Sequence, residues 1–442
     1  MNARDIGELK QLVSDLLTEA KKQGASSAEA GVHAQQGLDV TVRLGDTETI
    51  EHTNDQGLGV TLYFGNRKGS ANTTDLGADA VRETVAAACR IAKYTSEDPA
   101  AGLADANLMA RDIPDLDLNH PWDIDALQAA GIARECEDAA RGQDPRINNS
   151  EGASLHTQKS LFVYGNSHGF VGGYPSTRHS LSCAVLAGDG EQMQRDYWFT
   201  SDRLAERLQD PQAVGIEAAR RTIARLGSRK IKTTECPVLF KADLAPGLLR
   251  SLIGAIRGEA LYRKASFLLD HLGEQVFPDW VSIDENPRKR RGIASAPFDN
   301  EGVATSPRKL VDRGVLQSYV LDSYSARKLG MQTTANAGGV RNARIGTSGE
   351  SFDALLKKLD TGLLVTEMMG QGSNLVTGDY SRGAAGFWVE KGEIAYPVEE
   401  ITVAGNLKDM FQGLLAVGTD SQIPGSIETG SWLIDHMTIA GD

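Results

Sequence analysis

Several features that mark membrane-spanning, secreted or disulfide-bonded proteins are missing from this chain of 442 residues. No apolar run approaches the roughly 18 residues that a membrane span requires. The N-terminal segment carries Asp5 and Glu8 where a signal peptide needs an apolar core. The sequence therefore predicts a cytoplasmic protein with no membrane contact and with reduced thiols. No CxxC pair occurs among the four cysteines, which are Cys89, Cys136, Cys183 and Cys236.

Histidine, the commonest metal ligand, never occurs at a spacing typical of a metal site. None of the eight histidines forms an HxH, HxxH or HxxxH pair. His168 and His179 flank a glycine-rich loop and could approach each other across a hairpin. Scattered histidines are more often hydrogen-bonded surface residues, so the sequence predicts no metal ion on this chain.

Positive charge is also scarce. Lys and Arg number 46 against 59 Asp and Glu, which gives a formal net charge of −13. Because nucleic-acid binding depends on clustered Lys and Arg that neutralise phosphates, this balance predicts no nucleic-acid partner. The one basic run, residues 288–291, lies between Pro287 and Gly292. These flanks favour a solvated loop over a phosphate site.

The residues that are present indicate a globular α+β protein of two or three domains. Apolar residues make up 40% and charged residues 24% of the chain. The stretch 96–122 contains three prolines and no clear periodicity, which predicts a linker. We expect an N-terminal α+β domain over 1–95 and a central α+β domain over 123–226. A glycine-rich, mostly antiparallel β-domain is expected over 227–442.

Hydrophobic spacing predicts the elements within these domains. Apolar residues recur every three or four positions over 4–23, which predicts an amphipathic helix that ends at Gly24. Asp75 is expected to begin the second helix and Asp243 the helix that opens the last domain. Two further helices are expected over 123–141 and 202–226. Strands are expected at 38–42, 60–64, 160–164, 180–186, 194–200, 238–240, 314–321, 386–389 and 394–398.

The segment 378–390, GDYSRGAAGFWVE, concentrates chemically active side chains. Asp379, Tyr380, Ser381 and Arg382 place acid, phenol, hydroxyl and guanidinium groups in consecutive positions. These groups are suited to contacts with the backbone or carboxylate of an extended peptide. The alternative is that these residues pair with each other, Asp379 with Arg382, and brace the domain.

This segment resembles the PmbA/TldE half of the TldD/PmbA family. Four other pieces share the resemblance and follow the family's order through the C-terminal half of the chain. They are LYRKASFLL at 261–269, FDNEGV at 298–303, SARKLG at 325–330 and AGNLKDM at 404–410. The resemblance implies a subunit of a zinc metallopeptidase whose catalytic partner is of the TldD type.

The partner type is marked by an HExxxH motif on the helix that precedes the LYRKASF-like stretch. The matching positions here are 249–254, where Leu249 and Gly254 replace both histidines and Arg250 replaces the glutamate. An aliphatic side chain cannot bind Zn²⁺ and a guanidinium cannot act as a general base. The resemblance therefore implies no catalytic residue and no cofactor on this chain, with zinc carried by the partner.

The resemblance also implies how the chain works. It predicts a heterodimer with a TldD-like subunit that acts on unfolded or extended peptides, and leaves open a homodimer of the isolated chain. Arg263 and Lys264 adjoin the helix whose counterpart carries the metal, so they join the candidate residues that face substrate or partner. Two alternatives remain: a non-enzymatic protein of the gyrase-modulator type, and a stand-alone hydrolase that uses His168 or His179.

Overall fold

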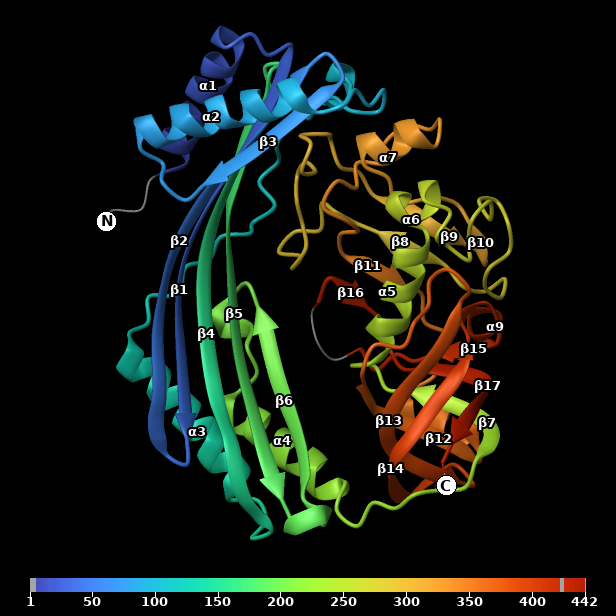
Figure 1. The fold of residues 1–442 in the computed structure, drawn as a ribbon. Helices are drawn as coiled ribbons and strands as arrows, with labels where there is room; N and C mark the ends of the chain where they lie inside the picture. Colours follow the sequence, from blue (N-terminus) through green and yellow to red (C-terminus); the bar gives the residue numbers. More distant parts are fainter. Residues whose placement is uncertain (1–4, 422–424, 442) are drawn as a thin grey trace.

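The computed structural model describes residues 5–421 and 425–441, which form two lobes (Figure 1). The first lobe, residues 5–226, is built on one antiparallel sheet with the strand order β3-β2-β1-β4-β5-β6. Its long strands are curved, and the second lobe, from residue 227 onward, lies beside them. The strands are β1 (Ser27–Arg43), β2 (Asp46–Phe64), β3 (Arg67–Thr73), β4 (Ile147–Asn166), β5 (Val171–Ala187) and β6 (Gln194–Asp202).

Four helices cover one face of this sheet. Even-numbered residues at the two ends of β1, from Ala28 to Val32 and from Leu38 to Val42, are buried beneath them, whereas the odd-numbered residues point to the other face. The first two helices cover one end of the sheet and the last two cover the other end (Figure 1). They are α1 (Ile6–Lys22), α2 (Ala78–Tyr94), α3 (Ala126–Arg141) and α4 (Pro211–Ala224), and short 3₁₀ turns lie at Ala106–Leu108, Gly190–Gln192 and Ala205–Arg207.

The opposite face of the sheet is polar over much of its length. Thr41 and Ser154 share a hydrogen bond of 2.8 Å across β1 and β4, and Asp39 Oδ2 lies 3.1 Å from His156 Nδ1. Near one end of this face, aromatic side chains of the sheet pack on Phe298 of the second lobe. One face of the sheet therefore holds the helices, and the other is available to the second lobe.

The second lobe has a six-stranded sheet of order β14-β13-β12-β7-β17-β15, and β14 also pairs with β17. This extra pairing closes five of the strands into a barrel-like ring around Phe240 and Trp432. The pair β7–β12 is parallel and the other pairs are antiparallel. The strands are β7 (Thr234–Phe240), β12 (Gly362–Met369), β13 (Asp379–Glu390), β14 (Glu393–Asn406), β15 (Leu414–Val417) and β17 (Trp432–Ala440).

A smaller sheet of order β10-β9-β8-β11-β16 and several short helices complete this lobe. The strands are β8 (Ile283–Glu285), β9 (Arg308–Asp312), β10 (Val315–Leu316), β11 (Ala343–Ile345) and β16 (Ile427–Glu428). The helices are α5 (Ala245–Ala255), α6 (Gly258–Tyr262), α7 (Ser323–Lys328), α8 (Phe352–Leu359) and α9 (Leu407–Gln412). Among the described helices, none combines the length and hydrophobicity needed to cross a lipid bilayer.

The predicted α+β class with largely antiparallel sheets is confirmed. The first helix ends as predicted, with Gly24 at φ 89° directly after the C-cap. The second helix begins at Ala78 rather than Asp75, whose carboxylate accepts instead from the backbone N–H of Gly77. The predicted helix over 202–226 begins only at Pro211, because Asp210 caps its first turn.

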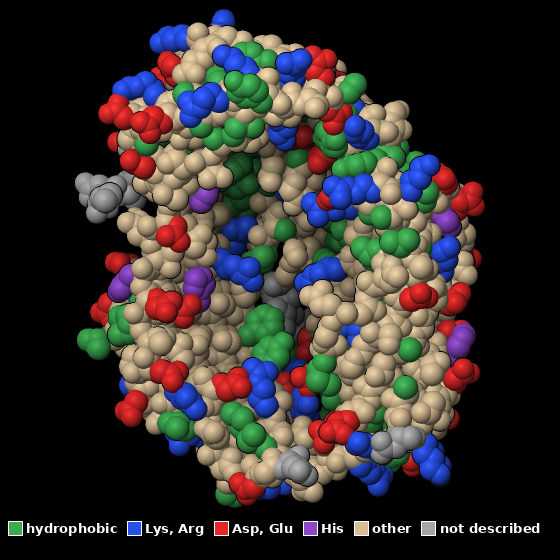
Figure 2. Space-filling model, in the orientation of Figure 1, with side chains coloured by type: hydrophobic (Ala, Val, Ile, Leu, Met, Phe, Trp, Pro, Cys, Tyr) green, Lys and Arg blue, Asp and Glu red, His purple; other side chains and the backbone are tan. Residues whose placement is uncertain are grey.

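The two lobes meet at both ends and leave a hollow between them. At one end Arg221 Nη1 lies 2.8 Å from Asp243 Oδ2, and at the other Lys328 Nζ lies 2.8 Å from Asp98 Oδ1. Figure 2 shows the hollow, with Lys and Arg side chains on both of its sides. The strands of the first lobe that border it come from both sides of the predicted linker 96–122, so the predicted domains 1–95 and 123–226 share one sheet.

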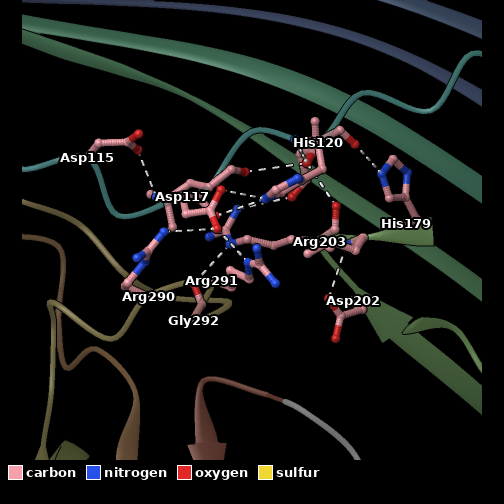
Figure 3. A network of polar contacts seen from close by, with 12 residues as sticks. Asp115, Asp117, His120, His179, Asp202, Arg203, Arg290, Arg291 and Gly292 are labelled. Atoms are coloured by element: carbon pink, nitrogen blue, oxygen red, sulfur yellow. Dashed lines mark hydrogen bonds and ion pairs between the residues drawn. The ribbon is translucent and has the colours of Figure 1, made fainter. Parts of the chain in front are cut away.

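A partly buried polar network joins the lobes at one junction (Figure 3). Arg203, which follows β6, donates from Nε to the carbonyl of Gly292 at 2.9 Å and from Nη2 to the carbonyl of Ile293 at 2.7 Å. Asp117 lies 2.5 Å from Arg291 Nε, and this contact holds the pKa of the Asp117 carboxyl below its usual range. Nearby, His179 Nε2 contacts the carbonyl of His120 at 3.0 Å.

This junction corrects the expectation of a solvated loop at 288–291. Arg291 pairs with Asp117, and Lys289 pairs with Glu428. Arg290 reaches the same Asp117 at 3.4 Å but remains largely exposed. The sequence could not indicate these partners, because Asp117 and Glu428 lie more than a hundred positions away on either side.

Candidate functional site

The helix α5 occupies the position at which the resemblance implies a metal-binding helix in the partner type. Its apolar residues recur at helical spacing, and Leu248, Leu249 and Leu252 are buried in the core of the second lobe. A proline in its first turn costs no backbone hydrogen bond, because the first N–H groups of a helix have no partner within it. Arg250 is exposed on the opposite side of the helix.

A loop of this same chain, residues 370–378, lies over the exposed side of α5. The hydroxyls of Ser251 and Ser373 are 3.5 Å apart. A Cβ built on Gly254 would lie 2.9 Å from Leu375 Cδ1, and the Leu375 carbonyl accepts from the backbone N–H of Phe267 at 2.8 Å. The space beside Gly254 is therefore filled by the chain's own leucine.

The residues at this helix do not fit a zinc ion. The two positions that match the histidines of the partner's motif carry Leu249 and Gly254. Leu249 is fully buried among apolar side chains, and Gly254 has no side chain. The Arg250 guanidinium offers only N–H donors and no acceptor that could ligate a metal ion. Among the described residues, no group of three or more His, Cys, Asp or Glu is placed to hold a metal ion.

The histidine pair considered for a metal or hydrolase site does not form. His168 lies in the turn between β4 and β5, and its Nε2 contacts the carbonyl of Ala104 at 3.1 Å. His179 lies within β5, where Nδ1 is 2.8 Å from the hydroxyl of Thr157. Burial lowers the pKa of His179, which favours the neutral imidazole.

The predicted contact residues at 379–382 begin β13 and alternate between its two faces. Asp379 and Ser381 are exposed, whereas Tyr380 is only 4% exposed and lies in the core of the second lobe. Burial raises the pKa of Tyr380, and the neighbouring Arg382 opposes this rise. Arg382 is half-buried, and its Nε has no hydrogen-bond acceptor among the described residues.

The Asp379 carboxylate contacts Thr377 and Asn406 rather than Arg382, the partner that the bracing alternative named. It accepts from the Thr377 hydroxyl at 2.6 Å and from Asn406 Nδ2 at 3.3 Å. These bonds hold the turn at Gly378, where φ is 85° and a Cβ would lie 2.9 Å from Asn406 Oδ1. Asp379 therefore braces the turn that carries loop 370–378 over α5.

Arg263 and Lys264 lie at the C-terminal end of α6. Arg263 pairs with Glu259 at 3.0 Å and is mostly exposed, and Lys264 is exposed with φ 55°. Among the described residues, no hydrogen bond or ion pair joins these two side chains to Asp379 or Ser381. The structure therefore brings the candidates into two separate groups, one at α6 and one at the start of β13.

Sequence reasoning missed loop 370–378 as part of the site. The loop reads GQGSNLVTG, and a single leucine between polar and glycine residues gives only a weak signal that it is anchored. The structure anchors it through Leu375 and through a bridge between Ser373 and Tyr380. The loop links the two features that the sequence singled out, the altered helix and the GDYSR segment.

Comparison with protein families covers nearly all of these elements. Residues 28–92 match the model of PmbA/TldA metallopeptidase domain 1, residues 119–226 match the central domain, and residues 233–441 match the C-terminal domain. The chain is 50% identical over 433 residues to Metalloprotease PmbA of Escherichia coli O157:H7, covering 98% of this chain and 96% of that protein. The Haemophilus influenzae homolog of this metalloprotease is also 50% identical, over 438 residues, with coverage of 98% and 96%.

Solved structures show the same architecture. A provisionally named modulator of DNA gyrase from Bacteroides thetaiotaomicron superposes with a TM-score of 0.93 at 28% identity, covering 98% of this chain and 99% of that one. TldE from Thermococcus kodakarensis shares the fold, with a TM-score of 0.82 at 19% identity and coverage of 97% and 100%. The chain therefore belongs to the PmbA/TldD metallopeptidase family and is of the PmbA type.

Proposed function

We propose that this chain is the metal-free subunit of a cytoplasmic zinc metallopeptidase of the TldD/TldE type that acts on unfolded or extended peptides. The partner is a TldD-like chain. Zinc bound there supplies the activated water that such chemistry requires. The role of this chain is to bind its partner and to help enclose and orient the peptide.

The observation that carries the proposal is the state of α5. Leu249, Arg250 and Gly254 cannot ligate zinc, and Leu375 fills the space beside Gly254. Membership in a metallopeptidase family combined with a helix that cannot hold the metal favours a supporting subunit over an independent enzyme. The exposed Asp379, Ser381, Arg263 and Lys264 are the proposed contacts to substrate or partner.

The hollow between the lobes supports the enclosure part of the proposal. It lies beside the polar face of the first sheet, whose hydroxyl and amide groups suit hydrogen bonds to a peptide backbone (Figure 2). A space closed by two subunits would admit flexible chains and exclude folded proteins. The proposed substrates are therefore peptides and unfolded segments.

The test is to measure zinc content and casein hydrolysis for the isolated chain, a TldD-like subunit and their mixture. We expect no stoichiometric zinc and no cleavage for the isolated chain, with cleavage by the mixture exceeding that of the partner alone. Sedimentation of the isolated chain decides between monomer and homodimer. Arg250→Ala should leave the activity of the mixture unchanged, since Arg250 takes no part in the chemistry.

Stoichiometric zinc and casein cleavage by the isolated chain would contradict the proposal. So would a mixture of two folded subunits that is no more active than the partner alone. Recovery of gyrase rather than a metallopeptidase subunit in a pull-down would instead favour the non-enzymatic alternative.

A further inference from the structure

A cavity of about 680 Å³ lies between the segment that joins the two halves of the first lobe and the second lobe. The segment 107–112 forms one wall, and residues of the loops 303–308 and 333–335 form the other. The walls are joined by backbone bonds: Ala110 N donates to the Gly302 carbonyl at 2.9 Å, and Ala304 N donates to the Leu108 carbonyl at 3.0 Å. These bonds fix the two walls relative to each other.

Three arginines line this cavity, which is unexpected in a chain with a net charge of −13. Arg111 comes from the first wall, Arg288 from the basic run, and Arg308 from the start of β9. No ion pair involves Arg111 or Arg288 among the described residues, whereas the neighbouring Lys289, Arg290 and Arg291 all pair with carboxylates. The acid that shares the lining is the exposed Asp112.

Arg288 and Arg308 are anchored in the cavity wall. Their Nε atoms are buried and make no hydrogen bond within the described part of the chain, while both side chains remain partly exposed. Arg308 Nε lies 3.3 Å from Glu285 Oε2, but the alignment does not make a hydrogen bond. Each guanidinium also carries N–H donors on its two Nη atoms, and these are the groups through which the lining arginines can bind an anion in the cavity.

We propose that this cavity binds a small oxyanion, a phosphate or a carboxylate, between Arg111, Arg288 and Arg308. Guanidinium groups match both anions through paired N–H donors, and Ser306 supplies a hydroxyl at the cavity wall. The Thr333 and Thr334 hydroxyls also lie at the cavity, but they donate to the Leu321 carbonyl and are therefore not free to donate to a ligand. Occupancy of the cavity ties the segment 107–112 to the second lobe.

The test uses the isolated full chain, so it is independent of the metallopeptidase proposal. Calorimetric titrations with inorganic phosphate, trialanine and trialanine amide are run at one fixed ionic strength. We expect phosphate, or trialanine but not its amide, to bind saturably at one site. Arg288→Gln and the exposed Arg111→Gln should each weaken that binding by about tenfold or more, the usual effect of removing a charged hydrogen-bond donor.

The matched control is Arg290→Gln, which removes the same charge from the same basic run at a side chain that points to Asp117 instead. It should bind like the unmodified chain. Saturable phosphate binding assigns the site to phosphate, and binding of trialanine alone assigns it to a carboxylate. The inference is overturned if neither anion saturates, if trialanine and its amide bind equally without phosphate binding, or if Arg290→Gln loses as much affinity as the two lining variants.

Discussion

Glu301 is a single residue whose surroundings oppose its charge. Its Oε2 accepts from the backbone N–H of Ser323 at 3.0 Å and from the Ser323 hydroxyl at 2.7 Å. Burial, with help from the neighbouring carboxylates of Asp299 and Asp322, nevertheless raises the pKa of Glu301 to about 7. The Glu301 carboxylate also contributes to the raised pKa values of the buried Tyr63 and Tyr164.

This pKa predicts a pH-dependent stability. Between about pH 4.5 and 7 the unfolded chain has lost the Glu301 proton while the folded chain retains it, so stability falls as the pH rises and levels off above 7. Glu301→Gln keeps an acceptor for Ser323 and removes the charge. The variant should therefore be more stable than the unmodified chain at pH 8, by about 1 to 3 kcal/mol. At pH 4.5 this gain in stability should be much smaller.

Urea unfolding at the two pH values measures this difference. The exposed Glu274→Gln serves as the control, with the same chemical change and no expected gain. An unfolding free energy of Glu301→Gln that follows that of the unmodified chain at both pH values would contradict the prediction.

The sequence allowed individual polar residues to be singled out, but it did not show in which direction their side chains point. Asp379 and Ser381 are exposed as a contact role requires, but Tyr380 points into the core. The reason is that β13 already begins at Asp379, whereas apolar alternation is visible only from 386 onward. As long as the first residue of β13 is unknown, the inward and outward positions of 379–382 cannot be assigned.

At the scale of elements, α3 and α4 pack closely against each other. A Cβ built on Gly215 of α4 would lie 2.1 Å from the backbone carbonyl of Cys136 on α3. Gly131 of α3, in contrast, has open space where its Cβ would be. The two glycines therefore offer a matched pair of substitutions.

Gly215→Ala should destabilise the protein by about 2 kcal/mol or more, because the methyl group must push two helix backbones apart. Gly131→Ala should stabilise it by up to about 1 kcal/mol, since alanine is the better helix former and meets no neighbour. Chemical unfolding of both variants measures the difference. Equal effects of the two substitutions would contradict the packing argument.

Helices with clear amphipathic spacing were predictable from sequence, and long strands were predictable only in part. The alternating residues at 38–42 and 60–64 belong to β1 and β2, which extend much further. Gln, Asn, Asp and Gly near Gln35 and Asn54 look like turn residues, but here they are paired with each other in the middle of the β1–β2 ladder. The short β8 and β11 could not be found, because their identity as strands depends on partners distant in sequence.

At the scale of the whole molecule, Arg203 connects the lobes. It is 6% exposed, and its three nitrogens donate to the carbonyls of Thr177, Gly292 and Ile293. The first carbonyl belongs to the first lobe and the other two to the second. A lysine can keep the charge but not the three directed bonds.

Arg203→Lys should therefore lower stability by about 2 to 4 kcal/mol, because buried carbonyls lose their donors. It should also speed amide hydrogen exchange in the loop around 287–296 while leaving the barrel of the second lobe protected. Exchange measured by mass spectrometry, together with unfolding curves, tests both effects. The exposed Arg207→Lys is the control, and the prediction fails if both variants exchange alike in that loop.

The arrangement of the lobes was beyond the reach of sequence patterns. Residues such as Asp117, Arg203 and Arg291 are individually ordinary, and their network exists only because three distant segments converge. The barrel closure by β14 and β17 likewise joins strands that local spacing cannot pair. Composition and motifs were sufficient to predict the fold class and the family of the molecule. The contacts between its lobes became visible only in the structure.

The central place of β1 in the first sheet governs the order in which that sheet can be built. Residues 29–42 pair on one side with the hairpin partner β2 and on the other with β4, through contacts such as Glu29 with Asn166. The ribosome delivers β4 only after α2, the linker segment and α3 have emerged. Until then one edge of β1 has backbone groups without strand partners, an aggregation-prone condition that makes a nascent chain a natural client for chaperones.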